Sequence, residues 1–127
     1  MPTVSAYKNL EYLASLRSVI GKDAIRKAIV TVGLNPDDKK HVGKYSLGMK
    51  QRLGLAQAIM ENPDILILDE PMNGLDNSGV EEMRDLFLKF KAESKTIILV
   101  SHNSEDIKML CDTVCEMDRG VLTSVKG

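Results

Sequence analysis

The stretch that decides the fold covers residues 44–76 and reads KYSLGMKQRLGLAQAIMENPDILILDEPMNGLD. It contains three blocks: a Ser and Gly step at 45–49 that opens a helical pattern, an apolar run at 65–68 that stops on Asp69 and Glu70, and a Pro and Gly turn that ends at Asp76. The apolar run is too short for a helix and does not alternate with polar residues. This predicts a parallel strand that is covered on both faces. The strand and its flanking helical patterns predict an α/β fold.

The residues before this strand predict three helices. Ser5 is placed to cap the first one, which stops at Gly21. Its apolar positions repeat with a helical period and are Leu10, Leu13, Ala14, Leu16 and Ile20. A second helix is predicted over 23–32, with Gly33 as its end, and a third over 47–61, which is closed by Asn62 and Pro63.

The residues after the strand predict a helix over 76–93, a second buried strand over 96–100 and a short helix after His102. A hairpin with strands at 113–117 and 121–125 closes the chain. Because the pattern changes from helices alone to alternating helices and strands near Pro63, we expect a helical subdomain over 1–63 and part of an α/β core over 64–127.

The composition excludes several classes of protein. The chain has 127 residues and a formal net charge of −1, which gives no reason to expect nucleic acid or an anionic membrane as a direct partner. No apolar run approaches the roughly 20 residues that span a bilayer. The start, MPTVSAYKNLEY, lacks the apolar core of a signal peptide, so we expect a cytoplasmic protein. We expect Cys111 and Cys115 to be two buried thiols and not a metal site.

With these blocks in place, the sequence closely resembles the ATP-binding cassette (ABC) ATPases, the motor subunits of ABC transporters. Residues 46–52 resemble the family's signature motif, 65–70 its Walker B strand and 73–76 its D-loop. His102 lies where the family has its switch histidine. The signature departs from the common Leu-Ser-Gly-Gly-Gln form at Tyr45, Leu47 and Met49. In this respect it resembles the subgroup that exports drugs, peptide antibiotics and similar amphiphiles.

The resemblance implies a role for each motif residue in ATP hydrolysis. Asp69 would hold Mg²⁺ through its water shell, Glu70 would polarise the attacking water, and His102 would contact the γ-phosphate and that water. The signature and D-loop would act on ATP held by a second subunit in a head-to-tail dimer, through Ser46, Gly48, Gln51 and Asp76. Without the resemblance, these residues are also compatible with two helix caps, two solvated acids at a strand end and a structural histidine.

The phosphate loop of the family, Gly-x4-Gly-Lys-Ser/Thr, is absent from this sequence. The pairs Gly43 and Gly48, and Gly74 and Gly79, have the spacing but lack the lysine. We therefore expect a partial P-loop NTPase (RecA-like) sheet with an N-terminal helical subdomain, from a truncated ABC subunit that is inactive alone. The family's phosphate-loop strand would lie beside the 96–100 strand, between it and the hairpin. An open edge there predicts self-association or a rearranged hairpin.

The implied parent function is ATP hydrolysis, with ATP and Mg²⁺ as cofactors, coupled to membrane transport. The helical subdomain would bind a transmembrane permease subunit and so hold the protein at the cytoplasmic face of the membrane. Two other readings stay open. One is a non-catalytic remnant that acts as an interaction module, and the other is a soluble ABC ATPase that acts on ribosomes or DNA.

Overall fold

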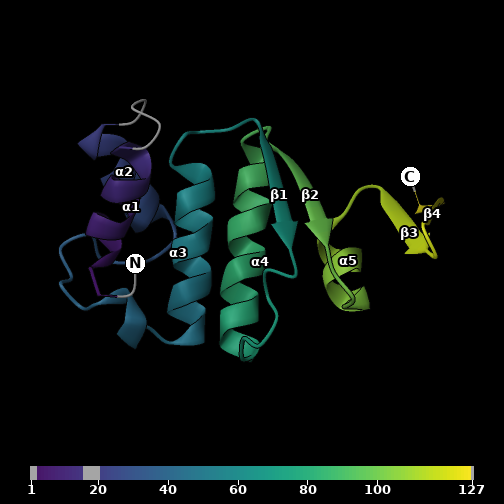
Figure 1. Cartoon of the computed structure of the whole chain (residues 1–127). Helices are drawn as coiled ribbons and strands as arrows, with labels where there is room; N and C mark the ends of the chain where they lie inside the picture. Colours follow the sequence, from purple (N-terminus) through teal and green to yellow (C-terminus); the bar gives the residue numbers. More distant parts are fainter. Residues whose placement is uncertain (1–2, 16–20, 127) are drawn as a thin grey trace.

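The N-terminal part of the molecule consists of helices. The computed structural model describes residues 3–15 and 21–126. Helices α1 (Ala6–Ser15) and α2 (Lys22–Thr31) come first, and a short 3₁₀ turn, η1 (Val42–Lys44), precedes α3 (Leu47–Ile59). Figure 1 shows α1 and α2 at one end of the molecule, with α3 beside the later helix α4 (Asn77–Ala92). The three predicted N-terminal helices are therefore present.

Local signals set the ends of these helices. The backbone N–H of Lys8 donates to Ser5 Oγ at 3.3 Å, so Ser5 caps α1 as predicted. Gly33, with φ of +83°, follows the end of α2 in the left-handed region that favours glycine. The predicted core positions Leu16 and Ile20 lie outside the described residues.

A two-stranded parallel sheet follows the helices. Strand β1 (Ile65–Asp69) pairs with β2 (Thr96–Val100), with Ile65 opposite Thr96 and Asp69 opposite Val100. Helix α4 connects the two strands and packs beside α3 (Figure 1). Because the strands are parallel and in register, both end at the same edge of the sheet, where the residues that follow them meet.

The prediction that these strands are covered on both faces is wrong for the described structure. Leu66 and Leu68 are buried, and the inward residues of β2 pack against the same core. On the other face, Ile65 is 57% and Ile67 70% exposed, because no described element covers them. Successive side chains of a strand point to opposite faces, so this all-apolar strand has one hydrophobic face that is exposed to solvent.

The C-terminal part consists of α5 (Ser104–Leu110) and the antiparallel hairpin β3 (Val114–Asp118) and β4 (Val121–Lys126). The hairpin turns at Arg119 and Gly120, which have φ of +50° and +80°, as a two-residue turn requires. It forms a separate sheet at the far end of the molecule from α1 (Figure 1), so in the described structure the outer edge of β2 is unpaired.

The expectation of two buried thiols is wrong. Cys115, on β3, is exposed, and Cys111, at the end of α5, is only partly buried. The physical reason for Cys115 is that four of the five residues of β3 are exposed, so side chains on both faces of this strand reach solvent.

One hydrophobic cluster connects the helices with the sheet. It includes Ile29 of α2, Leu55 of α3, Leu66 of β1 and Phe87 of α4. Because this cluster runs across position 63, the division into 1–63 and 64–127 stays a prediction. Within the part of the chain that the structure describes, no helix is long and apolar enough to cross a membrane.

Candidate functional site

Two acids lie where β1 ends. Asp69 is the last residue of β1 and is exposed, opposite Val100. The backbone N–H of Glu70 donates to the carbonyl oxygen of Val100 at 2.8 Å, which continues the pairing by one residue. Glu70 has φ of +47°, a conformation that is uncommon outside glycine, asparagine and aspartate. The buried Pro71 follows, and residues 71–74 form a turn.

Glu70 and His102 face each other across the strand ends. His102 Nε2 lies 3.3 Å from Glu70 Oε1, and the imidazole is 95% exposed. The two atoms are close enough for an ion pair when the histidine is protonated. Glu70 Oε1 is buried and has no hydrogen-bond partner among the described residues. A buried carboxylate oxygen without a partner is an unsatisfied hydrogen-bond acceptor, a feature that a functional site can explain.

The position of Asp69 suits a hydrated divalent cation. No group of three or more His, Cys, Asp or Glu side chains that could hold a metal ion occurs among the described residues. Magnesium keeps several of its waters and is usually bound by one or two carboxylates together with substrate phosphates. A single exposed carboxylate beside Glu70 matches that requirement, and its hard oxygen donors fit Mg²⁺.

The remaining predicted site residues lie around two helix N-termini. Ser46 is the N-cap of α3, and its Oγ accepts from the Met49 N–H at 3.2 Å. Asp76 is the N-cap of α4, and its Oδ1 accepts from the Gly79 N–H at 2.8 Å. The Ser46 hydroxyl group is exposed and can still donate its own proton. Each cap leaves other N–H groups of its first helical turn without a helical partner.

Both helix N-termini open on one shallow hollow. Ser46, Gly48 and Asp76 line it together with Gly74, and its volume is about 460 Å³. Gln51 fixes the loop that leads into α4, because its side-chain amide donates to the carbonyl oxygen of Asn73 at 3.4 Å. The structure therefore brings the predicted residues together in two groups, one at the strand ends and one around this hollow.

Arg52, the last residue of the predicted signature segment, makes contacts that the sequence patterns did not indicate. Its Nη1 donates to the carbonyl oxygen of Val32, at the end of α2, at 2.8 Å, and its Nη2 pairs with Glu82 of α4. One side chain of α3 thus connects α2 with α4. These partners are 20 and 30 residues away in sequence, so no local spacing could have indicated them.

A family model described as ABC transporter matches residues 1–73, more than half of the chain. The chain belongs to the ABC transporter ATP-binding family. Similar relatives include the uncharacterized ABC transporter ATP-binding protein YybJ of Bacillus subtilis, 45% identical over 96% of this chain and 56% of that protein. The bacitracin transport ATP-binding protein BcrA of Enterococcus faecalis is 44% identical over 94% of this chain and 39% of its own length. The lantibiotic transport ATP-binding protein SrtF of Streptococcus pyogenes is 40% identical over 87% and 48%.

Solved ABC structures have the same fold. The dimeric structure of MJ0796, described as a bacterial ABC transporter cassette, has a TM-score of 0.81 and 21% identity, and covers 100% of this chain and 59% of its own. The structure of cbiO1 from Clostridium perfringens, part of the ABC transporter complex cbiONQ, has a TM-score of 0.80 at 27% identity, over 97% of this chain and 50% of its own. This ABC family chain therefore spans between about two fifths and three fifths of the proteins it matches.

Proposed function

We propose that this chain supplies the catalytic carboxylate and the signature segment of an ATP-hydrolysing subunit in an ABC transporter. The observation that carries the proposal is the pairing at the strand ends. Glu70 Oε1 is buried, accepts no hydrogen bond in the described structure and lies 3.3 Å from His102 Nε2. Family membership makes nucleotide binding the expected use of this arrangement.

In the proposed reaction, Glu70 acts as the general base. Its carboxylate, which has an unsatisfied acceptor atom in Oε1, accepts a hydrogen bond from the attacking water and takes up the proton as the water oxygen approaches the γ-phosphorus. His102, exposed and next to Glu70, donates from Nε2 to the γ-phosphate and holds the water in line. Phosphoryl transfer depends mainly on such positioning and on charge stabilisation. Glu70 and His102 would supply both for the attacking water and the γ-phosphate.

Asp69 would hold Mg²⁺ in the same assembly through the metal's water shell. When bound, Mg²⁺ neutralises charge on the phosphate oxygens of ATP. The contribution of this chain is the position of the carboxylate, which is fixed by the pairing of β1 with β2 and placed directly before Glu70.

The hollow at the helix N-termini is proposed to face ATP bound to a second subunit. The Ser46 hydroxyl group and the free N–H groups beside Gly48 present donors and the positive end of the α3 dipole, which favours an anionic phosphate. Gln51 and Asp76 shape the approach to this phosphate by fixing the turn at Asn73 and the start of α4. The site would be completed in a head-to-tail dimer.

We propose that residues 1–63 form the helical subdomain and dock on a transmembrane permease subunit. This contact would keep the protein at the cytoplasmic face of the membrane. Two relatives carry bacitracin transport and lantibiotic transport in their names, which supports a peptide antibiotic or a similar amphiphile as the cargo of the whole transporter. Residues 64–127 would then be part of the ATP-hydrolysing core.

A second candidate is a non-catalytic interaction module. The bare face of β1, where Ile65 and Ile67 are exposed, favours it, because an uncovered apolar face of this kind is a protein contact site. Such a module would bind an intact ATPase subunit, and Asp69 and Glu70 would have no catalytic role.

Complementation separates the two candidates. The chain is mixed with the upstream half of a related cassette that carries a phosphate loop, and phosphate release from Mg-ATP is measured. We expect activity only in the mixture and its loss in Glu70→Gln. The matched control, Glu81→Gln, changes an exposed acid on α4 and should leave the activity unchanged. An assembled mixture that releases no phosphate would favour the interaction module.

A further inference from the structure

The short helix α5 begins two residues after His102, and its contacts determine where that histidine lies. Helix α5 has seven residues, far fewer than the roughly 12 to 15 that an isolated helix needs in water. Its position therefore depends on what it packs against. The one fully buried residue that the structure describes in α5 is not apolar but the acid Asp106, while Leu110 packs against the core from the far end of the helix.

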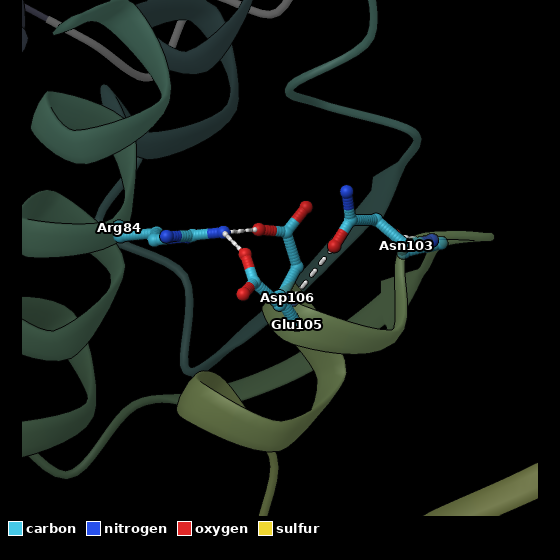
Figure 2. Close-up of polar contacts among 5 residues, drawn as sticks. Arg84, Asn103, Glu105 and Asp106 are labelled. Atoms are coloured by element: carbon cyan, nitrogen blue, oxygen red, sulfur yellow. Dashed lines mark hydrogen bonds and ion pairs between the residues drawn. The ribbon is translucent and has the colours of Figure 1, made fainter. Parts of the chain in front are cut away.

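Asp106 is held by Arg84 of α4. Figure 2 shows the Arg84 guanidinium group reaching from α4 to the first turn of α5. Arg84 Nε and Nη2 both donate to Asp106 Oδ1, at 2.8 Å and 2.5 Å, and Nη2 also lies 3.8 Å from Glu105 Oε2. The side chains of Arg84 and Asp106 are only 15% and 5% exposed, so water screens this pair little.

The segment that carries His102 is attached to the same anchor. Asn103 Oδ1 accepts from the Asp106 N–H at 3.0 Å, and the Asn103 N–H donates to Ser101 Oγ at 3.0 Å. The residues on both sides of His102 are therefore fixed by hydrogen bonds that lead to Asp106. The imidazole itself is almost fully exposed, and its one polar contact among the described residues is with Glu70. Its position must come from its backbone.

We propose that Arg84 and Asp106 are positioning residues that hold His102 against Glu70. The buried ion pair fixes the start of α5 relative to α4, and Asn103 transmits this position to the histidine. Because the pair joins the helix after the D-loop to the segment of the predicted switch histidine, a movement of α4 would change the distance between His102 and Glu70. The use of this contact in hydrolysis rests on the proposed function, but the contact itself does not.

The test uses NMR of the whole chain with ¹³Cε1-labelled histidine, which gives signals from two residues, His41 and His102. In the wild-type chain, Glu70→Gln should shift the His102 signals and leave the His41 signals in place. In Arg84→Gln, we expect the same Glu70 substitution to shift His102 by less than half as much, because α5 no longer holds the histidine in contact. The loss of response to Glu70, and not the loss of stability, is the diagnostic result.

The chain offers a matched control in a second ion pair from α4 to the same region. Lys91 Nζ lies 2.6 Å from Asp112 Oδ1, but both side chains are exposed. Lys91→Gln should leave the response of His102 to Glu70→Gln at its wild-type size. A full-sized response in folded Arg84→Gln would overturn the proposal. Where Arg84→Gln does not fold, Asp106→Asn, which keeps the shape of the side chain, decides in its place by the same criterion.

This result is independent of catalysis. If the mixed halves release no phosphate but the response of His102 depends on Arg84, the proposed function fails and the positioning role stands. If the mixture is active but the response does not depend on Arg84, the positioning role fails alone.

Discussion

Replacing Gly74 with alanine tests how the loop before α4 meets the start of α3. Gly74 has φ of +80°, where a side chain with Cβ costs about 1–2 kcal/mol. An added Cβ would lie 2.5 Å from Leu47 Cδ2, so that atom must move. Leu47 is exposed, and the end of its side chain can rotate away at low cost. We therefore expect Gly74→Ala to lower the free energy of unfolding by about 1–2 kcal/mol, mostly from the backbone.

Urea denaturation measures this change, and two other glycines serve as controls. Gly120 also has φ of +80° but has no atom within 4 Å of an added Cβ, so Gly120→Ala measures the backbone cost alone. Gly54 lies inside α3 with open space around it, and Gly54→Ala should raise the free energy of unfolding by about 0.5–1 kcal/mol. A Gly74→Ala chain as stable as the wild type would refute the described conformation of this loop.

Three further perturbations test other contacts. Arg52→Met removes the hydrogen bond to the Val32 carbonyl oxygen and the ion pair to Glu82. It should lower the free energy of unfolding, measured in urea, by about 1–3 kcal/mol. No change would mean that the connection between α2 and α4 is not stabilising. Burial, followed by the nearby negative charge of Asp38, raises the pKa of Tyr45 above its ordinary value of 10, because both disfavour the phenolate. Stability from this group should be fully present below pH 10 and fall as the pH rises through the folded-state pKa, and Tyr45→Phe should remove that fall. Ile67→Lys on the bare face of β1 should reduce self-association in sedimentation experiments. The control Val30→Lys changes a residue that is also exposed but lies on α2, and should not reduce it. Equal effects of the two substitutions would argue against association through the sheet.

Local features of the fold could be predicted because their causes are local. Ser5, Ser46 and Asp76 cap helices through hydrogen bonds to N–H groups three residues ahead, a spacing that is visible in the sequence. The hairpin turn at Arg119 and Gly120 follows from turn chemistry in the same way.

Features that depend on distant partners could not be predicted. The all-apolar pattern of β1 predicted cover on both faces, but such a pattern reports the environment for which a strand is suited, not which elements are present to cover it. The prediction that Cys111 and Cys115 are buried was wrong for the same reason. From the sequence, Asp106 in the first turn of α5 is expected only to interact with the positive end of the helix dipole. Its ion-pair partner Arg84 is 22 residues away, so no local pattern indicates the pair.

The sequence indicates which residues could form the candidate site, which stays a prediction, but not the geometry in which they lie. Parallel strands in register explain why residues after β1 and β2 meet at one edge. The buried Glu70 oxygen without a hydrogen-bond partner lies beside His102 because of the left-handed backbone at Glu70 and the anchoring of α5. Neither leaves a local signal in the sequence.

The most direct test of the central claim separates the catalytic rate from ATP affinity in the mixed assembly. If Glu70 activates the attacking water, Glu70→Gln should lower kcat by about 10²- to 10⁴-fold, the usual contribution of a general base, and leave the Kd for ATP nearly unchanged. If kcat and affinity fall together, or if kcat does not fall, Glu70 is not the catalytic base.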